Sequence, residues 1–328
     1  MIRIAVIGAG TFGRNHVRVA SEEPRVRLTH IVDTNLARAK EHAALYRAEA
    51  ASSIDEIVGH VDAAIVAAPT SAHAEIGCRL LEAGIDVLVE KPIAATLADA
   101  DRLIDAAARN HRILQIGHLE RFNPAIVELE RIATLPLFFE IHRMSVFTLR
   151  SLDVDVVLDL MIHDLDVVLA LVRAELKEIR AAGISILSPK VDIANVRLEF
   201  ADGCVANLTA SRVSTEKIRK LRVFQPGQYI SLDYAKQSAA VCTVGGENGL
   251  AFDPLPVAPA EPLKLQLAAF LDAVETRNPP KLTGSVARRT LEVALAVLDR
   301  IELHAGLVGE TLAAHTQATG WKPGSKET

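Results

Sequence analysis

The sequence predicts an α/β fold with two domains: an N-terminal parallel sheet flanked by helices, and a C-terminal α/β domain with a large open, mostly antiparallel sheet. Over residues 1–117, short apolar runs alternate with helical patterns, which is typical of parallel βαβ units. Over residues 179–234, strand patterns follow one another without a long helix between them, which favours antiparallel pairing. We therefore expect the boundary near 117–122, with domains at 1–118 and 119–328.

Length and composition agree with this division. A chain of 328 residues is too long for one compact core and suits two. Hydrophobic residues make up 50% and aromatic residues only 4%, so aliphatic side chains must build the core. The net charge is −5 and Lys and Arg are not clustered, so we expect neither nucleic acid nor a membrane as a partner. The apolar stretch 154–172 contains four aspartates, which excludes it as a membrane span.

The cysteines and the N-terminus indicate a cytoplasmic protein. Cys78, Cys204 and Cys242 are far apart and odd in number, which suits reduced thiols better than a disulfide framework or a zinc site. The chain enters a strand pattern at once, without the basic and apolar segments of a secretory signal.

The elements of the first domain follow from local patterns. Apolar runs that end in glycine or a polar residue predict strands, and apolar residues at helical spacing predict the helices between them. Asp55 and Glu56 suit the first turn of a short helix, and Gly84 suits a helix end. The predicted strands are 2–7, 27–32, 62–67, 86–89 and 112–116, and the helices are 12–21, 36–46, 53–58, 72–83 and 97–110.

The pattern changes in the second domain. Turns at 201–203 and 225–227 carry hairpin chemistry, and four prolines over 253–262 predict a loop. The predicted helices are 124–134, 154–172, 263–276 and 285–304, and the strands are 137–147, 179–187, 194–200, 204–211, 221–224 and 229–233.

A glycine-rich turn joins the first strand to the first helix. Gly8-Ala9-Gly10-Thr11-Phe12-Gly13 has the GxGxxG spacing of a Rossmann dinucleotide-binding domain. Gly8 suits the tight turn, Gly10 the close approach of a pyrophosphate, and Gly13 the contact of helix with strand. The helix N-terminus then offers free N–H groups to the phosphates.

The second strand closes on Asp33, at the position that binds the adenosine ribose in such domains. A carboxylate there repels a 2′-phosphate, and the following Thr34 supplies no cation, so the sequence favours NAD over NADP. Arg38 is the nearby residue that works against this preference.

Glu90-Lys91-Pro92 follows the fourth strand. Ligands of open α/β sheets bind beyond the carboxyl ends of the strands, so Lys91 is expected near a nicotinamide and its substrate. The alternative is a charged pair that is only solvated. His16, on the first helix, has no partner pattern and is expected to be a surface or packing residue.

These motifs together resemble the Gfo/Idh/MocA oxidoreductases. The resemblance rests on the GxGxxG turn, on Ala68-Pro69-Thr70 with His73 following, and on Glu90-Lys91-Pro92. It implies that these residues contact NAD, and that a second domain with a large open sheet binds substrate. It also implies a homodimer or homotetramer, because that sheet leaves a broad face that no helix of the chain obviously covers.

The family also carries Asp-x-x-x-His on the first long helix of its second domain, here Asp159 to His163. Residues four apart share one helical face, so Asp159 can orient His163, and Asp166 continues the stripe. The resemblance implies that Lys91, His163 and Asp159 are the catalytic group. The alternatives are acids that face water, or a metal site completed by His118 and Glu120; the resemblance implies no metal.

The junction 117–125 resembles that of the sugar-nucleotide 3-dehydrogenases, which include the UDP-N-acetylglucosamine 3-dehydrogenases. There Arg121 would suit a diphosphate and Asn123 an N-acetyl or hydroxyl group. The alternative is that both only cap the next helix, with Pro124 at its first position.

The expected activity is therefore NAD-dependent oxidation of a sugar hydroxyl. The C3 hydride of UDP-N-acetylglucosamine would pass to NAD while His163 or Lys91 takes the proton. Two alternatives stay open: a dehydrogenase of a free sugar or polyol such as inositol, and a non-enzymatic NAD-binding sensor.

Overall fold

The computed structural model describes residues 1–148, 154–245 and 249–319, and it consists of two compact units. The first comprises Met1–Glu128 and Val257–Glu292, and the second comprises Leu129–Pro256 and Val293–Thr328. The expected division at residue 118 treated each domain as one continuous segment. In the structure, by contrast, residues 257–292 return to the first unit, because the helix at 262–276 packs on the first sheet.

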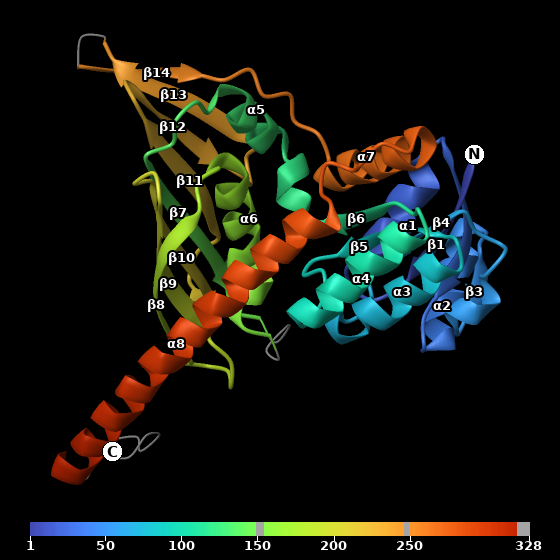
Figure 1. Ribbon diagram of the computed structural model, residues 1–328, viewed down its shortest axis with the longest axis horizontal. Helices are drawn as coiled ribbons and strands as arrows, with labels where there is room; N and C mark the ends of the chain where they lie inside the picture. The colour runs from blue at the N-terminus through green and yellow to red at the C-terminus, as the bar shows by residue number, and fades with distance from the viewer. Residues whose placement is uncertain (149–153, 246–248, 320–328) are drawn as a thin grey trace. The chain divides into compact units, whose positions relative to one another are not determined.

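The first unit is built on a six-stranded parallel sheet (Figure 1). Its strand order, β3-β2-β1-β4-β5-β6, is that of a doubly wound dinucleotide-binding fold. The strands are β1 (Ile2–Ile7), β2 (Val26–Val32), β3 (Glu49–Ala51), β4 (Ala63–Val66), β5 (Asp86–Glu90) and β6 (Leu114–Gly117). The predicted Rossmann architecture is therefore confirmed, and β3 is a short edge strand that the pattern did not predict.

Helices cover both faces of this sheet. Alternate residues of β1, such as Ile4 and Val6, pack in one cluster with Val17 of α1, Ala39 of α2 and Phe270 of α7. On the other face α3 packs against α4, where Gly77 leaves room for a leucine of α4. The helices are α1 (Gly13–Glu22), α2 (Leu36–Tyr46), α3 (His73–Glu82), α4 (Leu97–Arg109) and α7 (Pro262–Thr276), with short turns η1 (Ile54–Glu56), η2 (Thr70–Ala72) and η3 (Leu119–Phe122).

The second unit contains an eight-stranded sheet in the order β14-β13-β12-β11-β7-β10-β9-β8. Only β10 and β7 pair in parallel, so the predicted mostly antiparallel sheet is confirmed. The strands are β7 (Phe138–Val146), β8 (Leu176–Ile184), β9 (Ile193–Phe200), β10 (Val205–Ser214), β11 (Ile218–Gln225), β12 (Gln228–Asp233), β13 (Ser238–Val244) and β14 (Leu250–Pro254).

The helices of this part of the chain differ from the prediction in three respects. The predicted helix 154–172 is a π-helical turn, η4 (Val157–Met161), that continues into α6 (Ile162–Leu171). The helix α5 (Pro124–Ile132) ends two residues early, and α8 (Gly284–Thr319) extends well beyond residue 304. The helix α6 lies against one face of the sheet (Figure 1), held there by a buried ion pair described below.

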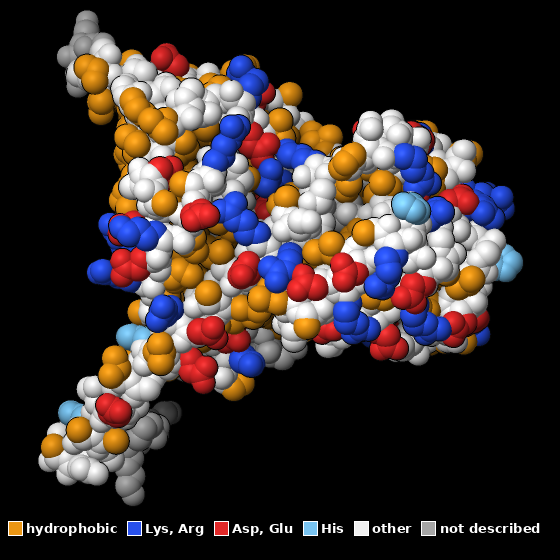
Figure 2. Space-filling model, in the orientation of Figure 1, with side chains coloured by type: hydrophobic (Ala, Val, Ile, Leu, Met, Phe, Trp, Pro, Cys, Tyr) orange, Lys and Arg blue, Asp and Glu red, His pale blue; other side chains and the backbone are white. Residues whose placement is uncertain are grey.

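The surface of the first unit carries charges of both signs. On the face seen in Figure 2, Lys and Arg side chains alternate with Asp and Glu and form no large patch of one sign. All three cysteines are buried free thiols. Within residues 1–148, 154–245 and 249–319, no helix is long and apolar enough to cross a bilayer.

Candidate functional site

The glycine-rich turn leaves open space where a phosphate group would lie. Gly8 has a φ of +92°, and a Cβ on Gly13 would lie 1.7 Å from the carbonyl oxygen of Gly8, so the fold itself requires both glycines. A Cβ on Gly10 would meet no atom within 4 Å. Packing inside the chain therefore does not explain Gly10, whereas a ligand close to the backbone at the start of α1 does.

Asp33 is fixed at the end of β2. Its side chain is 7% exposed, and its Oδ2 accepts a hydrogen bond of 2.9 Å from the backbone N–H of Ala9 in the glycine turn. Its Oδ1 accepts a bond of 2.8 Å from the N–H of Asn35. Arg38 Nη1 lies 3.4 Å from Asp33 Oδ2 and its side chain is 47% exposed. A guanidinium thus stands beside the carboxylate at the predicted ribose position.

A cavity of about 590 Å³ opens beside these residues, and half of the residues predicted to bind the cofactor line it. The other predicted residues, Thr11, Phe12, Gly13, Thr70, His73, Glu90 and Lys91, do not line it, and Phe12 is exposed at the start of α1. Residues without any motif line it as well, because β3, η1 and α3 reach the same edge of the sheet. The predicted lining residues are Gly8, Gly10, Asp33, Thr34, Arg38, Ala68 and Pro69, and those missed include Ser52, Ser53, Glu75 and Arg79.

His73 connects two turns at the carboxyl edge of the sheet. Its Nε2 lies 2.9 Å from the carbonyl oxygen of Ala68, and its Nδ1 lies 2.9 Å from that of Pro92. Burial lowers the pKa of His73, which is 1% exposed. A neutral ring donates to only one of the two carbonyls. His73 therefore acts between the Ala68 and Lys91 turns and does not line the cavity.

The Glu90 side chain points into the protein interior. It is 9% exposed, and its Oε1 lies 2.8 Å from Nε2 of His16 on α1. Gln266 of α7 donates to the same oxygen over 3.3 Å. Lys91, the next residue, is half-buried at the end of β5. His16 was expected to be a surface or packing residue; it is 2% exposed and has a specific polar partner.

The second unit supplies Asp159 and His163, which are both partly exposed on η4 and α6. Asp164 and Asp166 are buried, so Asp166 does not share the accessible face of His163. Arg143 of β7 forms a bidentate ion pair with Asp164, at 2.7 and 2.8 Å. This pair holds α6 on the sheet and leaves His163 on the accessible side of the helix.

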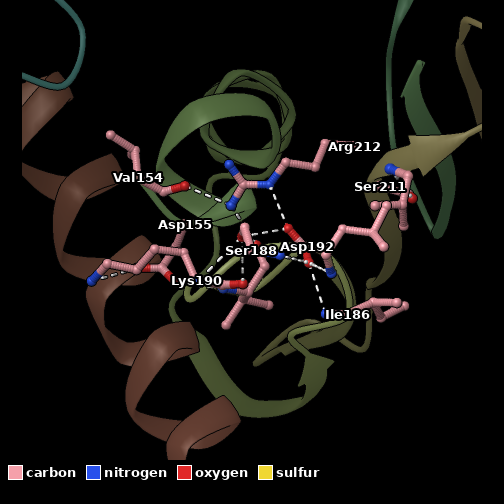
Figure 3. A network of polar contacts seen from close by, with 11 residues as sticks. Val154, Asp155, Ile186, Ser188, Lys190, Asp192, Ser211 and Arg212 are labelled. Carbon is pink, nitrogen blue, oxygen red and sulfur yellow. Dashed lines mark hydrogen bonds and ion pairs between the residues drawn. The ribbon is translucent and has the colours of Figure 1, made fainter. Parts of the chain in front are cut away.

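Hydrogen bonds from Arg212 of β10 and from the loop between β8 and β9 hold the start of this helical segment (Figure 3). Arg212 Nη2 donates to the carbonyl oxygens of Val154, at 2.6 Å, and Val191, at 2.8 Å. Asp155 Oδ1 accepts from the N–H of Val191 at 2.9 Å. Arg212 Nε lies 3.1 Å from Oδ1 of Asp192, which is fully buried. The position of the helix that carries Asp159 therefore depends on a buried Arg–Asp pair.

The pKa of the Asp192 carboxyl is lowered in this network. Burial acts to raise its pKa, but hydrogen bonds from the Ser188 hydroxyl and from the backbone N–H groups of Ile186, Leu187 and Ser188 lower its pKa to about 2. The stability that this carboxylate contributes is present above its unfolded pKa of 3.8 and is lost as the pH falls towards 2.

We expect Asp192→Asn to reduce the stability of the protein at pH 7 and to remove part of its acid sensitivity. A shift from 3.8 to about 2 corresponds to about 2 kcal/mol. The difference in unfolding free energy between the variant and the unaltered protein should therefore shrink as the pH is lowered from 4 to 2. Urea unfolding at several pH values measures it; a difference that stays constant over this range would contradict the assignment.

The junction residues are buried in the first unit. Asn123 is 3% exposed, its Oδ1 accepts from the N–H of Ala125 at 3.1 Å, and its Nδ2 donates to Glu120 over 3.2 Å. It therefore caps α5, as the alternative to a substrate role anticipated. Arg121 is 9% exposed, and Lys281 donates to its carbonyl oxygen at 2.9 Å.

The residues considered for a metal site are divided between the units. His118 and Glu120 belong to the first, whereas Asp159 and His163 belong to the second. Across the described part of the chain, no group of three or more His, Cys, Asp or Glu side chains has an arrangement that would hold a metal ion.

Known families and proteins resemble the chain over most of its length. Residues 2–118 match the oxidoreductase family with an NAD-binding Rossmann fold of the Gfo/Idh/MocA type, and residues 138–225 match a C-terminal domain of the same name. The UDP-N-acetylglucosamine 3-dehydrogenase of Acidithiobacillus ferrooxidans is 36% identical over 307 residues, which cover 92% of this chain and 97% of the relative.

Two further proteins are similar to the chain over most of its length. A solved structure of the Acidithiobacillus ferrooxidans enzyme has a TM-score of 0.88 at 35% identity and covers 92% of this chain and 98% of its own. Inositol 2-dehydrogenase 1 of Saccharopolyspora erythraea is 28% identical over 329 residues, which cover 90% of this chain and 93% of the relative.

Proposed function

Because the chain belongs to the Gfo/Idh/MocA oxidoreductase family, we propose that it is an NAD-dependent dehydrogenase that oxidises the C3 hydroxyl of UDP-N-acetylglucosamine to a 3-keto sugar nucleotide. The family membership makes the chain an oxidoreductase. The observation that supports the finer assignment is the 36% identity, over nearly the whole of both chains, to a UDP-N-acetylglucosamine 3-dehydrogenase.

The first unit fits a dinucleotide. The space above Gly10, the fixed carboxylate of Asp33 and the adjoining cavity suit a pyrophosphate and an adenosine ribose in turn. NAD⁺ supplies the hydride acceptor when bound. Among the chain's own residues, Gly8, Gly13 and Asp33 fix the shape of the site, and Ala68 and Pro69 line its wall.

We assign the proton chemistry to Lys91 and His163. One of them removes the proton of the reacting hydroxyl, and the other stabilises the developing alkoxide charge by a hydrogen bond. Asp159, four residues before His163, is assigned to holding the imidazole in one tautomer. The buried pairs of Arg143 and Arg212 support this assignment, because they fix the helix that carries both residues.

Asp33 and Arg38 set the cofactor preference in this proposal. NAD should bind more tightly than NADP, because the buried carboxylate repels a 2′-phosphate, and Asp33→Ala should narrow that difference. Arg38→Ala should widen it, since Arg38 is the cation beside the ribose position. Calorimetric titration of both cofactors measures this. Equal or tighter NADP binding by the unaltered protein would contradict the assignment.

We propose that the enzyme is a homodimer or homotetramer. The face of the second sheet opposite α6 carries a cross-strand aromatic row of Phe138, Phe224, Tyr229 and Phe252, the last 57% exposed. The same face is not uniformly apolar, because Glu140 and Arg222 pair on it.

Sedimentation equilibrium should give at least twice the chain mass of 35.3 kDa. Phe252→Asp should weaken the assembly, whereas a monomer at micromolar concentration would overturn the proposal.

The decisive experiment is NADH formation with a panel of nucleotide sugars and free polyols, with mass detection of the keto product. Turnover of UDP-N-acetylglucosamine supports the proposal. Turnover of inositol alone would favour the second candidate, which rests on the inositol dehydrogenase relative. NAD binding without turnover of any panel member would favour a sensor.

A further inference from the structure

We propose that His16 is a positioning residue for Lys91 and acts through the buried carboxylate of Glu90. This inference rests on the proposed function, because it assigns His16 to the reaction in which Lys91 takes part. It starts from a contact between residues 74 positions apart that no motif links. His16 lies on α1, directly after the glycine-rich turn, and Glu90 is the last residue of β5.

The Glu90 carboxylate is held on both oxygens. Oε1 lies 2.8 Å from His16 Nε2 and 3.3 Å from the amide nitrogen of Gln266. Oε2 accepts a hydrogen bond of 3.3 Å from the backbone N–H of Lys91. A buried carboxylate is costly unless donors surround it, so these contacts decide where the carboxylate lies. The Lys91 main chain is bound directly to it.

Neighbouring strands and helices leave the carboxylate little freedom. A Cβ on Gly117 of β6 would lie 2.6 Å from Glu90 Oε1, so the glycine provides the space that the carboxylate fills. Gln266 is fully buried, and its backbone carbonyl oxygen accepts a hydrogen bond from Gln115 Nε2 at 3.1 Å. Two sides of Glu90 are thus closed by β6 and α7, and His16 closes a third from α1.

His16 therefore links α1, the helix that follows the glycine-rich turn, to the turn that carries Lys91. Phe12 packs edge-on against its ring, with centroids 5.4 Å apart, which fixes the ring plane. Lys91 has a long flexible side chain, so the position of its amine depends on its main chain. The Glu90 carboxylate points at His16, Gln266 and the Lys91 N–H. We therefore infer that Glu90 fixes the conformation of the turn and does not contact a ligand.

The test compares His16→Leu, which removes the donor, with His16→Gln, which can still donate to Glu90. Val19→Ala is the matched control, because Val19 is 2% exposed on the same helix and packs in the apolar cluster. For each protein we would measure kcat and KM with UDP-N-acetylglucosamine, NAD affinity, thermal stability, and amide hydrogen exchange over residues 90–94 without ligands.

His16→Leu should lower kcat by about tenfold to a hundredfold, as expected for a lost hydrogen bond to a buried charged group. It should also speed exchange of the Lys91 amide. His16→Gln should keep kcat and the exchange rate of the Lys91 amide close to those of the unaltered protein. Val19→Ala should change thermal stability alone. Equal losses in His16→Leu and His16→Gln, or unchanged Lys91 exchange in His16→Leu, would overturn the proposal.

The exchange measurement separates this proposal from the proposed function. Faster Lys91 exchange in His16→Leu supports the positioning contact even if the unaltered protein turns over no sugar nucleotide, which would reject only the assigned reaction. If the unaltered protein turns over the sugar nucleotide but Lys91 exchange is unchanged in His16→Leu, the positioning contact is rejected and the proposed reaction is still supported.

Discussion

Lys91→Ala and His163→Ala should each lower kcat with UDP-N-acetylglucosamine by about two orders of magnitude or more, because acid–base groups typically contribute ~10²–10⁴-fold. NAD affinity should change far less. Neither side chain lines the cavity beside Asp33, where the adenosine contacts are assigned. Steady-state kinetics, with cofactor affinity measured separately by titration, gives both quantities.

Two further variants control this result. Asp159→Asn should lower kcat less than His163→Ala does, because the imidazole remains and only its orientation is less well fixed. Arg121→Ala should raise KM and leave kcat nearly unchanged if Arg121 contacts a diphosphate, since such a contact is similar in ground and transition states. Near-full turnover of both Lys91→Ala and His163→Ala would show that the catalytic assignment is wrong. If kcat falls in Lys91→Ala and His163→Ala but KM is unchanged in Arg121→Ala, a free polyol is favoured as the substrate.

The cofactor half of the molecule could be predicted because its signals are local. Gly8 and Gly13 are required by the turn itself, and Asp33 follows the strand whose end places it beside that turn. The order of strands and helices then follows from short apolar runs and their spacing. Ser52 and Arg79 carry no such signal, because only the folded sheet brings their segments to the cavity.

The parts that could not be predicted depend on distant contacts. His16 had no partner pattern because Glu90 lies 74 residues further along the chain. The strands β13 and β14 were not predicted; β14 is the edge strand, and it ends in Asp253-Pro254, which favoured a loop over a strand. The π-helical turn around Asp159 arises within a sequence whose apolar pattern indicates an ordinary helix.

The alternative weighed for the aspartates of α6, that they face water, is wrong for Asp164. Its side chain is 2% exposed and pairs with Arg143, which is equally buried. Sequence pattern alone does not separate an exposed acid from a buried one within a run of apolar residues. The partner that decides between them, on β7, lies 21 residues earlier in the chain.

Arg143→Met should lower the unfolding free energy by about 3–5 kcal/mol, because it leaves the Asp164 carboxylate buried without its partner. The contact of the Arg143 guanidinium with the Tyr234 ring, 4.9 Å from its centroid, would be lost as well. Urea unfolding measures the change. Arg102→Met is the matched control, since Arg102 pairs with Asp99 on α4 with 61% of its side chain exposed, and such pairs contribute about 0–1 kcal/mol.

The double variant Arg143→Met with Asp164→Leu tests the cause of that loss. If the cost comes from an unpaired buried charge, removing the charge should recover most of the stability, because apolar replacements of buried ion pairs are often close to neutral. If the cost comes from lost packing of the arginine stem, the double variant should be no more stable than Arg143→Met. Recovered stability with kcat still reduced would indicate that the ion pair also fixes the rotation of α6 that presents His163. Recovered stability with full kcat would limit the pair to holding the helix on the sheet.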